Sequence, residues 1–164
     1  MLVLLLVLVL GLIGEELNVE FYFDHEKLRV YQEALRFIAW CEEILQQCPA
    51  KAAAKDHLDH ASTSIALNIA KGNGKYSSKD RCRFLGIARG SALECAACLD
   101  ALVAKKRLSV QDVQPGKKVL QGIVSMLMGL INSVSERVEE AEALYGGPLN
   151  SEHVVEHEHE YEHE

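Results

Sequence analysis

Residues 61–100 read ASTSIALNIAKGNGKYSSKDRCRFLGIARGSALECAACLD, two apolar runs of helical spacing separated by Gly72 and Gly74. One face of the first run carries Leu58, Ala61, Ile65 and Ile69, and one face of the second carries Phe84, Ala88, Ser91, Cys95, Cys98 and Leu102. Spacing of three and four residues indicates amphipathic helices, and paired glycines end a helix. The stretch therefore predicts helices over about 52–71 and 78–105, with Ser77 or Ser78 capping the second.

Two further helices flank this pair. Asp24 can cap a helix that Pro49 stops, with an apolar face of Leu28, Tyr31, Leu35, Ile38 and Leu45. A last helix begins at Ser109 or Asp112, has Pro115 in its first turn and ends before Gly146, with an apolar face of Val119, Ile123, Met126, Leu130 and Val134. Short connections between four helices predict an all-α fold, an antiparallel up-down-up-down four-helix bundle.

The organisation of the chain follows from this pattern. We assign residues 23–147 to the bundle, residues 1–22 to an apolar leader and linker outside its core, and residues 148–164 to a disordered acidic Glu/His tail. Four leucines lie off the apolar faces, and they either widen the core or form a face for self-association: Leu67, Leu85, Leu120 and Leu127.

The charge is unevenly distributed along the chain. The formal net charge is -7, yet residues 1–23 and 148–164 hold nine of the 24 acidic residues and no Lys or Arg. Residues 24–147 therefore carry 15 acidic and 17 basic side chains, a net charge of about +2. The predicted bundle is mildly basic, so the overall acidity does not exclude a nucleic-acid partner.

Six cations surround the predicted turn between the two central helices: Lys71, Lys75, Lys79, Arg81, Arg83 and Arg89. Asp80 is the one carboxylate among them before Glu94. Such a cluster can contact RNA phosphates in a salt-sensitive manner that tolerates many sequences. The alternative is a solvated helix end that serves only solubility.

Polar residues on the central helices favour structural roles. Arg89 and Glu94 are expected to form ion pairs with neighbouring helices, with RNA contact as the second interpretation for Arg89. Ser62, Ser64 and Asn68 are expected to pack and to form hydrogen bonds between helices, because no general base is positioned to activate the hydroxyls.

Metal-binding and catalytic motifs are weak. The five cysteines are an odd number inside helical patterns, so we expect reduced thiols, and Cys95 and Cys98 lack a second CxxC pair. His57 and His60 supply two ligands at most, and His157 and His159 lie in the tail. We predict no metal site, no cofactor and no enzymatic activity.

A family resemblance rests on FDHEKL (23–28), ASTSI (61–65), NIA (68–70), GNG (72–74) and FLGIARGS (84–91) with Glu94. Over about residues 23–135 the chain resembles the four-helix bundle family encoded within 23S ribosomal RNA intervening sequences. The resemblance implies a ring-like homopentamer, and it includes the accessory protein of diversity-generating retroelements, which binds nucleic acid and a reverse transcriptase. It implies structural roles for Ser62, Ser64, Asn68, Gly72, Gly74, Arg89, Gly90, Ser91 and Glu94.

Two positions depart from the family pattern. The family commonly has Pro where Ala66 stands and Glu where Lys71 stands. Lys71 makes the turn more basic, which favours the RNA interpretation.

The leading functional prediction is a cytoplasmic, non-catalytic homo-oligomer that binds structured RNA. The alternatives are a membrane-tethered or exported bundle that uses the apolar run of residues 1–13, a metal-binding protein that uses the His-rich tail, and a scaffold with no nucleic-acid role. The apolar run is short for a membrane span, which needs about 20 residues.

Both ends of the chain are explained by one property of the messenger RNA. Glu codon GAG and Leu codon CUC are reverse complements, as are His codon CAC and Val codon GUG. Read backwards, residues 164–156 pair in this way with residues 2–10 at eight of nine positions, and Tyr161 against Leu5 is the exception. We predict that the two gene segments form an inverted repeat. Sequencing the gene checks this, and codons outside these two complementary sets would contradict it.

Overall fold

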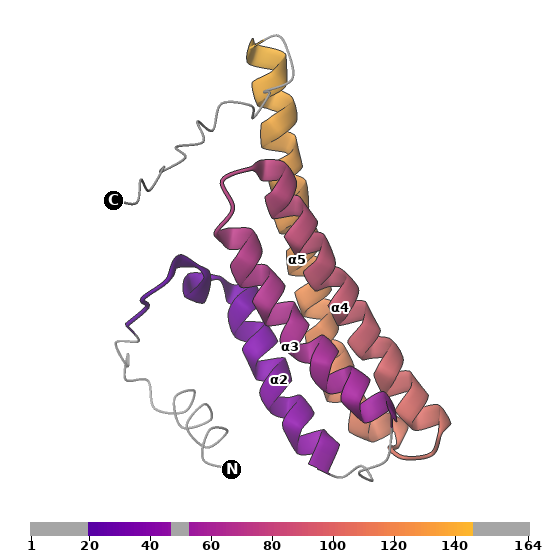
Figure 1. The fold of residues 1–164 in the computed structure, drawn as a ribbon. Coiled ribbons are helices and arrows are strands. Elements are labelled where there is room, and N and C mark those ends of the chain that lie inside the picture. Colours follow the sequence, from indigo (N-terminus) through magenta and orange to yellow (C-terminus); the bar gives the residue numbers. More distant parts are fainter. Residues whose placement is uncertain (1–19, 47–52, 146–164) are drawn as a thin grey trace, which may run out of the picture.

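The computed structural model describes residues 20–46 and 53–145 of the 164-residue chain, and these residues are helical with no strand among them. A 3-10 helix, η1 (Asp24–Lys27), precedes four α-helices: α2 (Arg29–Gln46), α3 (Ala53–Asn73), α4 (Ser78–Ala104) and α5 (Val110–Tyr145) (Figure 1). Residues 1–19, 47–52 and 146–164 lie outside the described residues. They include the apolar run, Cys48, Pro49 and the acidic tail with His157 and His159.

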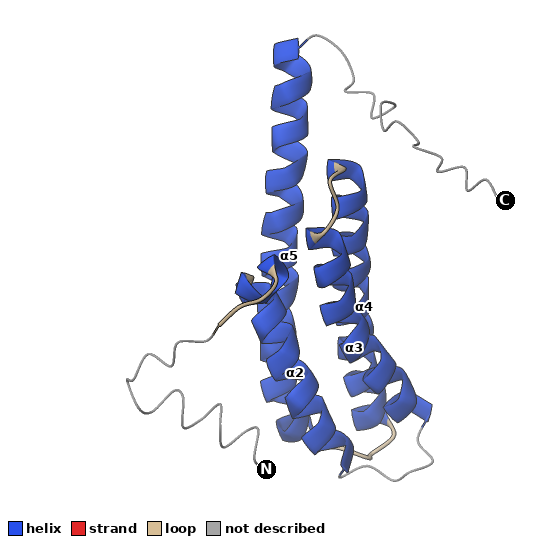
Figure 2. Ribbon diagram, turned by 60° about the vertical axis from the view of Figure 1, so that its left-hand side comes forward, coloured by secondary structure: helices blue, strands red, loops and turns tan. Residues whose placement is uncertain are grey.

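Each of the four α-helices packs against two of the others. α2 contacts α3 and α5, and α4 also contacts α3 and α5. The turn between α3 and α4 and the turn between α4 and α5 lie at opposite ends of α4 (Figure 1). α5, the longest helix at 36 residues, extends beyond the ends of its neighbours (Figure 2).

The core is built from aliphatic side chains of all four helices around Phe37. Its largest fully buried members include Leu58, Ile65, Ile69, Leu85, Leu99, Leu102, Ile123 and Leu127. Three of the four leucines off the predicted faces, Leu85, Leu120 and Leu127, therefore widen the core. Leu67 has 53% of its surface exposed.

The predicted apolar face of the first helix is partly wrong. Leu35 has 46% of its surface exposed, whereas α2 buries Val30, Ala34, Phe37, Cys41, Ile44 and Leu45. Both sets recur every three to four residues, so the spacing alone fits either face. The start also differs, because Asp24 begins the separate helix η1 and Leu28 adopts an extended backbone conformation before α2.

The starts of α4 and α5 are held by side-chain caps. The Asp80 backbone N–H donates to Ser77 Oγ over 3.3 Å, so Ser77 is the N-cap of α4. At α5, the Ser109 N–H donates to Asp112 Oδ2 (2.7 Å), and the Asp112 N–H donates to Ser109 Oγ (3.2 Å). Since α5 begins at Val110, Pro115 lies in its second turn and not in the first as predicted.

The end of α4 uses a left-handed residue that is not glycine. Lys106 has φ 54°, and its N–H donates to the Val103 carbonyl oxygen over 2.8 Å. The Arg107 N–H donates to the Leu102 carbonyl oxygen over 2.9 Å, which completes a Schellman motif. These two hydrogen bonds to otherwise unbonded carbonyl groups offset the energetic cost of the left-handed backbone conformation at Lys106.

Gly72 permits close contact between α3 and α4. An ideal Cβ placed on Gly72 would lie 3.2 Å from Phe84 Cβ, 3.4 Å from the Arg81 carbonyl oxygen and 3.5 Å from Leu85 Cγ. α3 continues through Gly72 to Asn73, two residues beyond its predicted end at Lys71. Gly72 therefore acts by the absence of a side chain at a tight helix contact.

Gly116 likewise permits a close contact, here between α2 and α5. The Trp40 indole stacks on Phe37, with ring centroids 5.6 Å apart and an interplanar angle of 29°. A Cβ built on Gly116 would lie 2.1 Å from Trp40 Cζ3 and 2.2 Å from Cη2, closer than atoms can approach. The Trp40 ring thus occupies the space over the α5 backbone that a side chain at residue 116 would fill.

We predict that Gly116→Ala lowers the free energy of unfolding by about 1–3 kcal/mol, since Trp40 has to leave its packed position. Gly122→Ala on the same helix is the matched control, because a Cβ on Gly122 meets no atom within 4 Å. The control should gain about 0.5–1 kcal/mol from helix propensity. Urea unfolding monitored by circular dichroism gives both values, and equal stabilisation by the two substitutions would contradict the packing of Trp40.

Candidate nucleic-acid interface

The connection between α3 and α4, together with the adjoining helix ends, carries a group of exposed cations. Lys71 lies near the end of α3, Lys75 lies in the connection, and Lys79 and Arg83 lie in the first turns of α4. All four residues are exposed. We call these four residues, with the intervening connection 74–77, the basic turn.

Phe84 organises two of these cations. Lys75 Nζ lies 5.3 Å from the centroid of the Phe84 ring, and Arg83 Cζ lies 5.9 Å from the same centroid. Both contacts are within the range of cation–π attraction. The ring of Phe84, which is half-buried, therefore holds Lys75 and Arg83 as neighbours.

Arg81 does not belong with the freely exposed cations. Its side chain is half-buried, and Nη2 donates to Asn73 Oδ1 over 3.3 Å. Its Nε atom is buried without a hydrogen-bond partner among the described residues. Arg81 thus ties the start of α4 to the end of α3, and it is a poorer candidate for phosphate contact than the sequence suggested.

The start of α4 lies beside α5. Cys82 Sγ lies 3.9 Å from the Ile131 carbonyl oxygen and 3.9 Å from Ser135 Oγ, so α5 passes beside the start of α4. The next turns of α5 bring the exposed carboxylates Glu136 and Glu140. Arg137 lies between these carboxylates and is also exposed, so α5 brings side chains of both charges beside the basic turn.

The cations of the basic turn are not neutralised by ion pairs among the described residues. Ion pairs within residues 20–46 and 53–145 are Lys27–Asp24, Arg36–Glu33 and Lys117–Asp100. The last one joins α4 to α5 far along α4 from the basic turn. Four unpaired cations at one end of a bundle present a positive potential to solvent.

The expected ion pairs of Arg89 and Glu94 are not formed between described residues. Both side chains are exposed on α4, and neither takes part in any of the three ion pairs. Arg89 lies more than one turn beyond Arg83, so it extends the positive surface along α4. The prediction of buried pairing was wrong because residues 89 and 94 face away from the core side of the helix.

Hydroxyl and amide side chains at the α3–α4 contact bond to one another and to backbone carbonyl oxygens of α3. Ser64 Oγ and Ser91 Oγ lie 2.8 Å apart, and Asn68 Nδ2 donates to Ser64 Oγ (3.1 Å) and to the Ser64 carbonyl oxygen (2.8 Å). Ser62, which is buried, donates to the Asp59 carbonyl oxygen of its own helix. The bond between Ser64 and Ser91 joins the two helices, as expected, and sets their register.

The described cysteines are free thiols, as the sequence predicted. Cys41 and Cys95 are buried, and Cys82 and Cys98 are half-buried. Burial raises the pKa of Cys95 to about 12 and raises the pKa of Cys41 and Cys98 as well. These thiols are therefore protonated at neutral pH and act as small core side chains. Within the described residues, no group of three or more His, Cys, Asp or Glu could hold a metal ion.

Two aromatic residues of this region were missed by the sequence analysis. Phe84 was assigned to the core face, yet it supports Lys75 and Arg83. Tyr76, in the connection itself, is fully exposed. The available signal was an aromatic residue among lysines in a segment of glycine and serine, KGNGKYSSK (71–79).

Comparison with known proteins shows which family this sequence and this fold resemble. The sequence model of the 23S rRNA-intervening sequence protein family matches residues 26–129, from η1 to α5. A solved structure of a protein of unknown function of the S23 ribosomal protein family from Bacteroides thetaiotaomicron has a TM-score of 0.59 and 19% sequence identity. The matched region covers 62% of this chain and 97% of the chain of that protein.

The search of curated proteins found no match. The family match spans more than half of the 164 residues and includes α2, α3, α4 and the first part of α5. The structural similarity independently supports the fold. The chain belongs to the 23S rRNA-intervening sequence protein family.

Proposed function

We propose that this protein is a non-catalytic, homo-oligomeric helical bundle that binds the phosphates of structured RNA through the basic turn. The observation that carries the proposal is the set of four exposed cations at one end of α3 and α4, without a carboxylate partner among the described residues. Unpaired cations release counterions from RNA when they bind it, which is the main source of non-specific affinity.

The non-catalytic assignment is supported by the polar groups near the basic turn. The Ser64, Ser91 and Asn68 side chains bond to one another, and no histidine or carboxylate of residues 20–46 and 53–145 forms a hydrogen bond with them. A nucleophile needs an adjacent base to be activated. Free cysteines favour a reducing compartment, so we assign the protein to the cytoplasm. We also propose the antiparallel up-down-up-down order, which the short α3–α4 and α4–α5 connections favour.

The homo-oligomer is supported by the outer face of α4. Gly86, Gly90, Leu93 and Ala97 recur every three to four residues on the exposed side of this helix. A Cβ on Gly86 or Gly90 would meet no atom within 4 Å, and half of the Leu93 surface is exposed. A smooth apolar stripe facing solvent is typical of an association surface. We propose that a second copy covers it, with five copies as the number that the family resemblance implies.

The membrane alternative has one supporting observation among the described residues. Val110–Val138 of α5 is long enough and apolar enough to cross a membrane, with a mean hydropathy of 1.3 over its most apolar window. The same helix contributes Leu120, Ile123 and Leu127 to the bundle core. We therefore attribute its apolar character to packing and association. A reverse transcriptase partner remains a prediction from the family resemblance.

Charge removal tests RNA binding. We predict that the triple substitution Lys71→Gln, Lys75→Gln and Lys79→Gln weakens binding of a structured RNA at least about tenfold. We also expect it to reduce the slope of log affinity against log salt by about 2–3, because each phosphate contact contributes about 0.9. The matched control substitutes Lys105, Lys106 and Lys118, exposed lysines at the other end of α4 and the start of α5. Filter binding at several salt concentrations measures both, and equal losses in the two variants would contradict a specific interface.

A charge in the apolar stripe tests association. We predict that Leu93→Glu dissociates the oligomer while the helix content stays unchanged, because a carboxylate would be buried without a partner between copies. Leu35→Glu, at a similarly exposed leucine of α2, is the control. Light scattering after size-exclusion chromatography gives the mass of each variant. A monomeric wild-type protein, or dissociation by Leu35→Glu alone, would contradict the proposed face.

A further inference from the structure

Tyr76 is the most exposed large hydrophobic side chain of the described residues. It lies in the four-residue connection between α3 and α4, between Lys75 and Ser77. An aromatic ring in water gains nothing from core packing. Its full exposure leaves the ring available to a ligand from solution.

The surroundings of Tyr76 are cationic. Lys75 precedes it, and Lys79 and Arg83 follow one turn apart on the same exposed side of α4. The Phe84 ring is already occupied by Lys75 and Arg83, with contacts of 5.3 and 5.9 Å. Tyr76 is thus the ring at the basic turn that remains open on both faces, and its neighbours can hold the phosphates that accompany a base.

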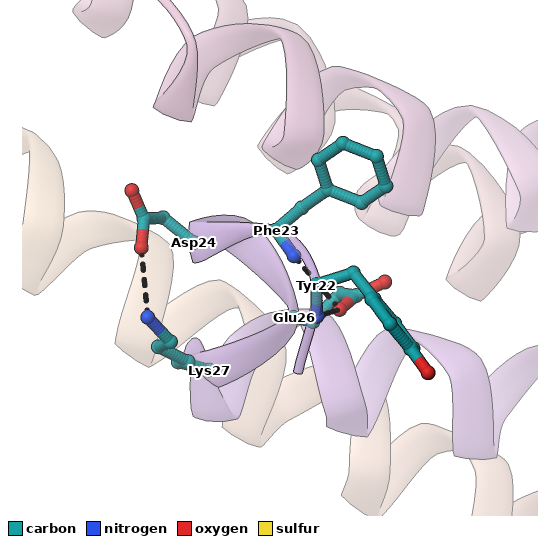
Figure 3. Close-up of polar contacts among 5 residues, drawn as sticks. All are labelled: Tyr22, Phe23, Asp24, Glu26 and Lys27. Atoms are coloured by element: carbon teal, nitrogen blue, oxygen red, sulfur yellow. Dashed lines mark hydrogen bonds and ion pairs between the residues drawn. The ribbon is translucent and has the colours of Figure 1, made fainter. Parts of the chain in front are cut away.

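The other exposed aromatic cluster of the described residues has the opposite charge. Phe21, Tyr22 and Phe23 precede η1, and the Glu26 carboxylate accepts the backbone N–H groups of Tyr22 (2.8 Å) and Phe23 (3.1 Å) (Figure 3). These hydrogen bonds lower the pKa of Glu26, so the carboxylate is ionised at neutral pH. Asp24 pairs with Lys27 in the same turn, and Glu20 lies within 3.4 Å of the Tyr22 hydroxyl. Phosphate is disfavoured there by like charge.

We infer that Tyr76 is a stacking platform for an unpaired RNA base, and that the basic turn therefore selects RNA with single-stranded or loop nucleotides over continuous duplex. This inference rests on the proposed RNA-binding function and adds the class of RNA. Bases in a duplex are stacked on each other and leave no free face for a protein ring, whereas loop bases are available. Aromatic stacking tolerates every base, so the selection is for structure and not for sequence.

The test compares two RNAs of equal length and charge, a hairpin with an unpaired loop and a blunt duplex, against the full-length chain. Tyr76→Ala should weaken binding of the hairpin by about 5- to 150-fold, the range observed for one stacked base, and leave duplex binding unchanged. The salt dependence should not change, because no cation is removed. Tyr76→Phe should retain the wild-type affinity, since the ring face and not the hydroxyl makes the contact.

Tyr22→Ala is the matched control, an exposed tyrosine in the acidic cluster that should leave hairpin affinity unchanged. A hairpin carrying 2-aminopurine in its loop adds a direct readout, because stacking on Tyr76 quenches its fluorescence and Tyr76→Ala should abolish the quenching. Equal hairpin binding by wild type and Tyr76→Ala would overturn the inference and leave the proposed function intact. Failure of the wild-type protein to bind either RNA would overturn both.

Discussion

The close contact between α3 and α4 is the constraint on which the remaining structure depends. Gly72 brings the α3 backbone against Phe84 Cβ and the Arg81 carbonyl oxygen, and the Ser64–Ser91 hydrogen bond sets the register of the two helices two turns further along α3. With this spacing, four residues suffice to join the helices, and Ser77 caps α4 at once. A short connection restricts the conformations of its side chains before a ligand binds. Less conformational entropy is then lost on binding, which favours affinity.

The same contact separates the cations of this region into two kinds. Arg81 faces Asn73 and is half-buried between the helix ends, so its charge serves the fold. Lys75 and Arg83 lie on the outside and share the Phe84 ring, so their charges remain available to a ligand. Unpaired surface cations contribute little to stability. The fold does not need these charges, which leaves them available for the proposed RNA contact.

Local sequence patterns predicted the helices well but their faces less well. The four helices followed from apolar spacing, and each cap of α4 and α5 was narrowed to two residues, from which the structure selects Ser77 for α4 and a reciprocal pair of Ser109 and Asp112 for α5. Leu35 was misjudged because two overlapping sets of residues in one helix both have a spacing of three to four. The ion pairs expected of Arg89 and of Glu94 with neighbouring helices were misjudged because both residues lie on the exposed side of α4. Which set is buried depends on the neighbouring helices, and no local pattern contains that information.

By itself, therefore, the sequence determined the all-helical class, the approximate helix limits and the location of positive charge at the α3–α4 connection, since each depends on residues adjacent in the chain. The tertiary structure alone decided that Gly72 and Gly116 serve close packing and that Arg81 is bound while Lys75 is free. It also decided that Tyr76 is exposed. Gly116 meets Trp40 from a distant part of the chain, and even Arg81 meets Asn73 only because α4 folds back against α3, so these properties depend on how the helices pack and not on a local sequence pattern.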